Sequence, residues 1–355
     1  MYLKRVLAFL GAVLPLVAAD TVVGGPMAVN VGPRSATIVW IVQSGEVSLK
    51  GGGEERHAPA LRVEKTTFTG LKSGVSYEYT IPGHEDLKGT FKTAPTRAEP
   101  FEFVVYGDTR TRHDVHRKVV AAILANSKPD FVLQTGDLVA DGNDPALWPI
   151  FFDIERELLR QTAFFPALGN HERNSANYYE YMQYSAYYSF NWGNAHFSVL
   201  DSDMGNFGNS DASRQAFWKQ QTDWLEQDLS KNQKAEYRFV SAHHPPMTAV
   251  ASRQGDNPHM TALMPMFEKY HVTAAFFGHD HNYQHYLKNG VHYIITGGGG
   301  APLYDVDKPP EGITIKVATT ENFTRVRVNG KLAHLDALLP DGSTLDSAEF
   351  EGASH

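Results

Sequence analysis

The sequence predicts an α/β sandwich over residues 98–352, preceded by a small all-β sandwich over residues 20–97. Before residue 97, short alternating runs interrupted by Gly and Pro indicate strands, and helical periodicity is missing. Beyond that point, apolar runs alternate with amphipathic stretches, which is typical of an α/β core. After residue 278, alternating runs are joined by Asn-Gly and Asp-Gly pairs, which are turn signals of β-hairpins.

Residues 71–79, Leu-Lys-Ser-Gly-Val-Ser-Tyr-Glu-Tyr, carry the most specific pattern of the first region. Together with residues 89–93 they resemble the late strands of a fibronectin type III-like module, in which a Tyr packs at the sandwich corner. Residues 93–96, Thr-Ala-Pro-Thr, then have the composition of a linker. The resemblance implies a separate β-module in front of the α/β region.

Five strands and four helices are predicted before the final hairpins. The strands are expected at residues 101–106, 130–134, 164–168, 237–242 and 274–277. The helices are expected at residues 113–126, 146–162, 214–229 and 259–270.

The first 19 residues have the pattern of a cleaved signal peptide. Lys4 and Arg5 precede apolar residues 6–17, and Val-Ala-Ala at 17–19 is a small-residue cleavage site. An uncleaved membrane anchor is the alternative, but the apolar run of about a dozen residues contains a proline and falls short of the ~20 that span a bilayer. We therefore expect a secreted or periplasmic protein with no membrane span after cleavage.

The composition excludes several functions. With 42% hydrophobic and 20% charged residues, the chain is globular and not disordered. The formal net charge of −8 provides no basic surface, so we expect no nucleic-acid partner. Because cysteine is absent from the sequence, any metal must be bound by oxygen and nitrogen ligands. The oligomeric state is left open.

Polar motifs follow all five predicted strands, where open α/β sheets gather their ligands. A Gly-Asp pair alone is more often a turn, and a lone His is more often structural, but five such motifs after apolar runs indicate one site. The motifs are Gly107-Asp108, Gly136-Asp137, Gly169-Asn170-His171-Glu172, His243-His244 and Gly278-His279-Asp280-His281.

These residue types suit a pair of metal ions. Two carboxylates, one amide oxygen and three imidazoles can hold two cations about 3.5–4 Å apart, a spacing suited to in-line displacement at phosphorus. A shared carboxylate, Asp137, would bridge the ions. A zinc-protease helix would need His residues at i and i+4, a pattern that this sequence lacks.

The order Gly-Asp, Gly-Asp, Gly-Asn-His-Glu, Val-x-x-His, Gly-His-x-His resembles the calcineurin-like metallophosphoesterases, and the β-region in front resembles the purple acid phosphatases. The resemblance implies a four-layer αββα sandwich with two metal ions, Fe, Zn or Mn. It also implies the hydrolysis of a small phosphomonoester by attack of a metal-bound hydroxide. Carried over by motif, the ligands of metal A are Asp108, Asp137 and His281, and those of metal B are Asp137, Asn170, His243 and His279.

The resemblance also implies that His171 contacts the phosphate and protonates the leaving oxygen. Two rival functions remain open. One is a phosphodiesterase or nucleotidase that uses the same site. The other is a surface-binding protein with a degenerate phosphoesterase domain, against which the complete set of six ligands argues.

The sequence departs from the family pattern at two positions. Ala140 stands where purple acid phosphatases have the iron-binding Tyr, and Arg110 stands where other members have a His ligand. Metal A is thus left with three protein ligands where the resemblance implies four. His116 either supplies the fourth or is an exposed residue at a helix terminus.

Further residues are expected around the metals. Arg110 either binds the substrate phosphate or pairs with a structural acid such as Asp141. His244 either lines the pocket or packs on the following proline, and Glu172 and Asp280 are expected to orient His ligands. Together, Arg110, His244 and His116 complete the candidate site around the six ligands and His171.

Overall fold

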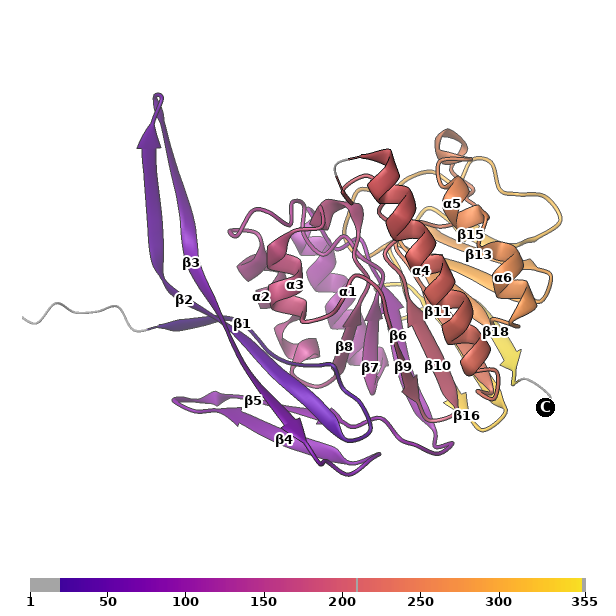
Figure 1. Cartoon of the computed structure of the whole chain (residues 1–355), viewed down its shortest axis with the longest axis horizontal. Helices are drawn as coiled ribbons and strands as arrows, with labels where there is room; N and C mark the ends of the chain where they lie inside the picture. The colour runs from indigo at the N-terminus through magenta and orange to yellow at the C-terminus, as the bar shows by residue number, and fades with distance from the viewer. Residues whose placement is uncertain (1–19, 209, 353–355) are drawn as a thin grey trace, which may run out of the picture.

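The computed structural model describes residues 20–208 and 210–352. Two β-sheets pack face to face, with helices on their outer faces (Figure 1). This arrangement confirms the predicted αββα sandwich. The predicted signal peptide, residues 1–19, lies outside the described residues. No helix in the described part of the chain has the length and apolar character needed to cross a membrane.

The first sheet has nine strands, in the order β18-β17-β16-β6-β7-β8-β1-β2-β3. Its parallel centre consists of β6 (Phe101–Tyr106), β7 (Phe131–Gln134) and β8 (Ala163–Pro166). An antiparallel group lies on each side: β16 (Phe323–Asn329), β17 (Leu332–Leu338) and β18 (Thr344–Glu351), and β1 (Thr21–Val29), β2 (Ser35–Gly51) and β3 (Glu54–Thr69).

The second sheet has seven strands, in the order β15-β13-β14-β12-β11-β10-β9. Its strands are β9 (Tyr188–Trp192), β10 (Ala195–Val199), β11 (Tyr237–Ser241), β12 (Ala274–Phe277), β13 (Tyr283–Lys288), β14 (Val291–Thr296) and β15 (Thr314–Ala318). The central strands β10, β11, β12 and β14 are parallel. Strands β9 and β10 were missed by the sequence prediction.

An aromatic core joins the two sheets. Phe103 on β6 meets Phe197, Phe239 and Phe276 of the second sheet edge to face, with ring centroids 5.3, 5.5 and 6.0 Å apart. Central strands that are buried on both faces need near-continuous apolar sequence, which is why these runs were recognisable as strands.

Helices cover the outer faces. Residues of α1 (His113–Asn126) and α2 (Trp148–Leu159) pack in the core of the first sheet. Residues of α4 (Asp211–Lys231), α5 (Pro258–Thr261) and α6 (Met264–Lys269) form a second core on the far side of the second sheet. The sequence predicted one helix at 259–270, and this prediction is wrong, because the structure has the two short helices α5 and α6 there. Pro265 lacks the N–H that a helix interior requires, so a new helix begins beside it. A short α3 (Ala176–Met182) follows β8.

The N-terminal region is all-β, as predicted, and it is attached to the α/β region by strand pairing. Ala28 of β1 pairs with Ala163 of β8, so β1–β3 continue the nine-stranded sheet. Strands β4 (Ser76–Ile81) and β5 (His84–Lys92) form a separate pair. The Tyr77 hydroxyl accepts a bond from the Lys72 N–H, the contact of a tyrosine corner. The fibronectin type III-like character of this region stays a prediction.

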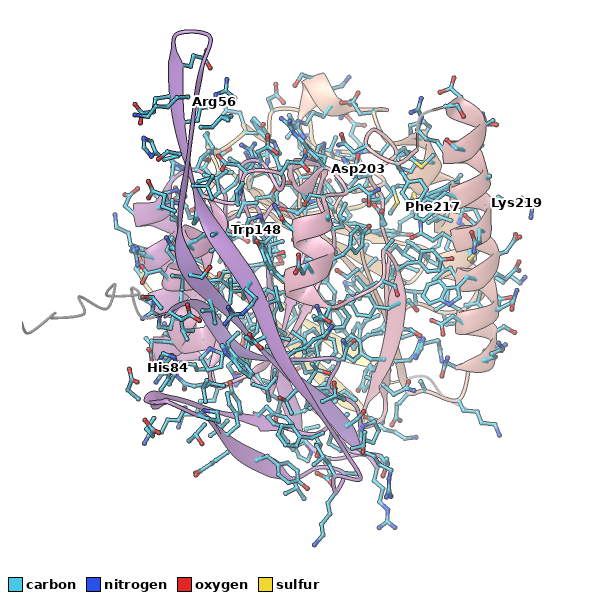
Figure 2. All side chains as sticks on the ribbon, turned by 60° about the vertical axis from the view of Figure 1, so that its left-hand side comes forward. Arg56, His84, Trp148, Asp203, Phe217 and Lys219 are labelled. Atoms are coloured by element: carbon cyan, nitrogen blue, oxygen red, sulfur yellow. The ribbon has the colours of Figure 1, made fainter. Side chains whose placement is uncertain are left out.

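The distal half of the β2–β3 hairpin projects from the rest of the chain, and Arg56 lies near its tip (Figures 1 and 2). The base of the hairpin, in contrast to its tip, is buried. Val39 and Ile41 are fully buried together with Met27 and Val29 of β1. The base is therefore part of the core, whereas the tip is not.

Deleting residues 20–95 should strongly destabilise the α/β region. The deletion would expose the apolar surface that β1 and the base of β2 cover, and we expect at least about 5 kcal/mol to be lost, comparable with the whole stability of a domain. Thermal unfolding measures the effect. The matched control replaces only residues 46–57 of the exposed tip by a short turn and should unfold at the wild-type temperature. Equal stability of both variants would contradict the shared core.

Asp336 should stabilise the C-terminal hairpins above about pH 4. Its carboxylate accepts bonds from Arg325 and Arg327, both 2.8 Å long, and from His334 and Ser347. Burial alone would raise the pKa of Asp336, but the hydrogen bonds from Arg325, Ser347 and His334 bring it to about 2. A depressed folded-state pKa gives stability above the unfolded-state value and loses it as the pH falls through the folded-state value.

We expect Asp336→Asn to lower the free energy of unfolding by about 1 kcal/mol at neutral pH, because solvent around the half-exposed Arg327 screens the pair. The difference from wild type should vanish between about pH 4 and pH 2, as followed by urea denaturation. Asp114→Asn, at an exposed position, is the control. A pH-independent difference would contradict an electrostatic origin.

Candidate metal centre

The five predicted strand-end motifs follow β6, β7, β8, β11 and β12, and the fold brings them to one place. Asp108 and Asp137 both have left-handed backbone, with φ of 59° and 57°, which is uncommon for residues other than glycine and typical of functional sites. The glycines that precede Asp137 and His279 allow the loops to approach one another closely. A Cβ on Gly136 would lie 2.8 Å from His243 Nδ1, and one on Gly278 would lie 2.4 Å from Asp108 Oδ2. The Gly-x motifs therefore reflect loop packing.

The structure brings Asp108, Asp137 and His281 together as one candidate ligand group, with ligand atoms within 4.8 Å of one another. All three are buried. His281 Nδ1 lies 2.6 Å from the Pro302 carbonyl, so this nitrogen carries the proton and donates it. Nε2, 3.4 Å from Asp108 Oδ1, is thereby directed at the group.

A second group surrounds Asn170. Its Oδ1 lies 3.1 Å from both His243 Nε2 and His279 Nδ1, and these two nitrogens are 3.3 Å apart. His243 donates its Nδ1 proton to the Thr135 carbonyl at 2.8 Å, so Nε2 is the ring nitrogen directed at this group. Three ligand atoms thus point at one another, an arrangement that a cation between them would satisfy.

Asp137 belongs to both groups. Its Oδ1 lies 3.4 Å from His243 Nε2, while its Oδ2 lies 3.3 Å from Arg110 Nε. Burial alone would raise the pKa of Asp137, but the charges of His243, His171 and Arg110 lower it below its ordinary value. The carboxylate is therefore ionised at neutral pH. With a shared carboxylate and nitrogen and oxygen ligands on both sides, the residues fit two divalent ions.

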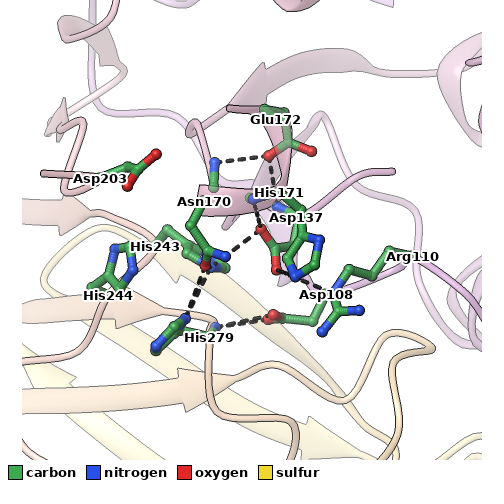
Figure 3. Close-up of polar contacts among 12 residues, drawn as sticks. Asp108, Arg110, Asp137, Asn170, His171, Glu172, Asp203, His243, His244 and His279 are labelled. Carbon is green, nitrogen blue, oxygen red and sulfur yellow. Dashed lines mark hydrogen bonds and ion pairs between the residues drawn. The ribbon is translucent and has the colours of Figure 1, made fainter. Parts of the chain in front are cut away.

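The structure places Arg110 and His171 beside Asp137, on the side away from His244 (Figure 3). Arg110 pairs with Asp137 and not with Asp141, whose partner is Arg173. His171 donates its Nδ1 proton to the Ala140 carbonyl at 2.7 Å, and its Nε2 lies 3.9 Å from Asp137 Oδ2. Both side chains thus lie beside the same oxygen of the candidate ligand Asp137.

His244 lies inside the second group. Its ring centroid is 4.2 Å from that of His279, and its ligand atom lies within 4.8 Å of those of His243 and His279. Burial lowers the pKa of His244 well below its ordinary value, so the imidazole is neutral. The structure thus places His244 beside two candidate ligands, and its role in lining the substrate pocket stays a prediction.

The loop after β10 was missed by sequence reasoning. Ser202 Oγ lies 2.9 Å from the ring nitrogen Nδ1 of His244 and accepts a hydrogen bond from the backbone N–H of His244, so it orients this ring. Asp203, on the same loop, lies near Asn170 and His244 (Figure 3). Asp201 is buried, and this burial raises its pKa to about 8. Residues 195–199, Ala-His-Phe-Ser-Val, alternate apolar and polar side chains, and Asp-Ser-Asp follows at 201–203, so a strand is again followed by polar residues. That signal could have revealed the loop.

His116 does not join the metal ligands. Its Nε2 lies 2.6 Å from Glu155 Oε1, and the same carboxylate accepts a bond from the Tyr106 hydroxyl. His116 on α1 and Glu155 on α2 are both buried and are only 1% and 0% exposed. Neither a ligand role nor an exposed helix terminus describes this residue, because the buried carboxylate of Glu155 draws its ring into the core.

Glu172 and Asp280 were predicted to orient His ligands, but their contacts are different. Glu172 binds backbone N–H groups, and Asp280 pairs with an arginine. Glu172 accepts bonds from the backbone N–H groups of Gly169, Asp137 and Leu138, and so ties the second and third motifs together. Burial raises the pKa of Glu172 to about 8. Asp280 lies 3.3 Å from Arg253 Nη1.

Arg253 and Tyr304 hold the fourth and fifth loops together. The Arg253 guanidinium lies 4.3 Å from the Tyr304 ring centroid and donates to the Tyr304 hydroxyl and the His279 carbonyl. Tyr304 in turn stacks on His281, with ring centroids 4.3 Å apart. Neither residue was singled out from the sequence, because no local pattern marks them.

Comparison with known proteins gives a consistent result. The family model for the calcineurin-like phosphoesterases matches residues 101–283, just over half of the chain. Tartrate-resistant acid phosphatase type 5 from Mus musculus is 28% identical over 251 residues, which cover 59% of this chain and 75% of the relative. The Homo sapiens enzyme of the same name is 27% identical, over 53% of this chain and 66% of its own length.

Two solved structures share the fold. The purple acid phosphatase PPD1 from yellow lupin seeds has a TM-score of 0.71 at 16% identity and covers 92% of this chain and 74% of its own. PhoD has a TM-score of 0.64 at 14% identity, with 92% and 91% covered. At such identities the likeness concerns the fold alone. From the family match, with its acid phosphatase relatives, it follows that the chain is a hydrolase of phosphate esters and belongs to the calcineurin-like phosphoesterase family.

Proposed function

We propose that this chain hydrolyses small phosphomonoesters at a centre of two metal ions. The observation that carries the proposal is that Asp137, a member of the group with Asp108 and His281, also lies 3.4 Å from His243 of the second group. Asp108, Asp137 and His281 would hold one ion, and Asp137, Asn170, His243 and His279 the other. Ions bound there would supply the nucleophile and neutralise the charge that builds up on the phosphate oxygens.

The side chains around the ligands have separate tasks in this proposal. Arg110, fixed beside Asp137 by its Nε, presents its remaining N–H groups to a phosphate oxygen. His171, held by the Ala140 carbonyl, protonates the leaving oxygen. Positive charge of this kind attracts a phosphorylated substrate to a chain whose net charge is −8. Nothing in this role requires His116.

The signal-peptide pattern of residues 1–19 supports the further proposal that the enzyme acts outside the cytoplasm, as a secreted or periplasmic protein. The complete ligand set argues against a degenerate, purely binding role. A phosphodiesterase or nucleotidase would use the same ligands, so the substrate class has to be tested directly.

The test starts from chelated protein that is reloaded separately with Zn²⁺, Mn²⁺ or iron. Hydrolysis of p-nitrophenyl phosphate, bis(p-nitrophenyl) phosphate and AMP is then compared, with chelated protein as the control. We expect the monoester to be hydrolysed faster than the diester, and only after metal is added. Preference for the diester or for AMP would favour the alternative functions, and no hydrolysis with any metal would overturn the proposal.

The iron-loaded protein should be colourless. The purple colour of the similar phosphatases comes from a tyrosine phenolate on ferric iron, and Ala140 stands at that position. The tyrosines nearby in sequence are engaged elsewhere: the Tyr178 hydroxyl donates to Pro166, that of Tyr179 to Asn174 and that of Tyr283 to Asp346. The visible absorption spectrum after iron loading is the measurement. Ala140→Tyr is the matched variant and should gain an intense band, whereas a purple wild type would contradict the ligand set of metal A.

A further inference from the structure

A cavity of about 200 Å³ is lined in part by the two loops that carry the candidate ligands Asp108 and Asp137. Thr109 and Leu138, which line the cavity, directly follow the candidate ligands Asp108 and Asp137 in sequence. The two loops are bonded to each other, since Thr109 Oγ1 donates to the Leu138 carbonyl at 3.1 Å. The metal ligands and the cavity wall therefore belong to the same rigid pair of loops.

The lining is mainly apolar. It includes Leu138, Val139, Ala140, Leu147 and Phe151, while His116, which also lines the cavity, has its Nε2 engaged by Glu155. A dry cavity of about 150 Å³ with aliphatic and aromatic walls is enough to bind benzene. The volume and the walls thus suit one aromatic ring, or an aliphatic group of similar size, better than a charged group.

The cavity is also close to the proposed proton donor. Ala140 lines it, and the carbonyl of Ala140 holds His171 Nδ1 at 2.7 Å. A proton delivered to the leaving oxygen arrives next to the organic group attached to that oxygen. The organic group must therefore lie near His171, and the apolar cavity is on the same loop.

We propose that this cavity receives the organic group of the substrate, so that the enzyme prefers phosphomonoesters of an aromatic or similarly sized apolar alcohol. The inference rests on the proposed function. Leu147, an apolar lining residue directly before α2, then sets the size of the accepted group. It is a specificity-determining residue and is not one of the candidate metal ligands.

The test compares p-nitrophenyl phosphate, an activated monoester, with acetyl phosphate, an activated acyl phosphate whose leaving group is much smaller. Leu147→Trp should fill the cavity and lower kcat/KM for p-nitrophenyl phosphate by about 10- to 100-fold, while acetyl phosphate changes by less than about twofold. Leu147→Ala should enlarge the cavity and shift the preference toward 1-naphthyl phosphate. Ala146→Leu, at the exposed neighbouring position, is the control and should keep the wild-type ratios.

Binding measured by calorimetry separates this inference from the proposed function, because it needs no turnover. Metal-loaded wild type should bind phenylphosphonate more tightly than methylphosphonate, and Leu147→Trp should lose the difference. If the wild type hydrolyses monoesters but neither Leu147 variant alters the ratios or the binding difference, the cavity inference is overturned and the proposed function stands. If no ester is hydrolysed, the proposed function fails, and the calorimetric comparison still decides whether the cavity takes the ring.

Discussion

Asp137→Ala is expected to reduce hydrolysis at least about a thousandfold and to remove metal from both sites. One oxygen of this carboxylate lies near His243 in the second group, while the other lies near Arg110. Without the shared carboxylate, each ion loses a charged ligand, and the remaining imidazoles and amide bind divalent ions more weakly. Metal content per chain, measured by elemental analysis after dialysis, is read together with kcat/KM.

Two further variants show whether the shared position is special. Asn170→Ala removes a ligand of the second group alone and should deplete only one ion per chain. Asp141→Ala removes a partly exposed carboxylate that pairs with Arg173, and it should keep both ions and full activity. Retention of two ions by Asp137→Ala, with normal turnover, would contradict the assignment of this residue to both groups.

The elements around the site were largely predictable because their signals are local. The helix at 113–126 and the strands at 101–106 and 274–277 have the predicted bounds, since a buried strand reads as a short apolar run and a packed helix as a periodic one. Strand β10 was missed because His196 and Ser198 interrupt its apolar side chains, so it does not read as a continuous apolar run. Its polar ending, Asp-Ser-Asp, does not begin with the glycine that precedes the ligands Asp108, Asp137 and Asn170.

The contacts that the sequence could not predict are long-range. His116 and Glu155 are 39 positions apart, and the bonds of Glu172 to Asp137 and Leu138 span 35 and 34 positions. The pairing of β1 with β8 depends on the twist and edge of a finished sheet, and not on any pattern within residues 20–97. Composition shows that such polar groups are present, but only the fold determines which buried carboxylate meets which donor.

His171 differs from the metal ligands in that its side chain is 28% exposed, whereas those of Asp137 and His243 are nearly inaccessible. Its backbone N–H donates to Asp137 Oδ1, and this bond survives any change of the side chain. Truncating the ring should therefore leave the ligand groups in place. Metal content is expected to be unchanged in His171→Ala.

Turnover of His171→Ala should depend on the leaving group. An alkoxide departs slowly unless it is protonated, and general acid catalysis contributes about 10²–10⁴-fold, so we expect a loss of this size on alkyl phosphates. p-Nitrophenolate needs little protonation, and the loss on p-nitrophenyl phosphate should be much smaller. The slope of log kcat against leaving-group acidity is the measurement, and it should be steeper for the variant than for the wild type. His57→Ala, on the exposed hairpin tip, is the control. Parallel slopes with a uniform loss would show that His171 binds the phosphate without donating a proton, and loss of metal would show that it supports the ligands instead.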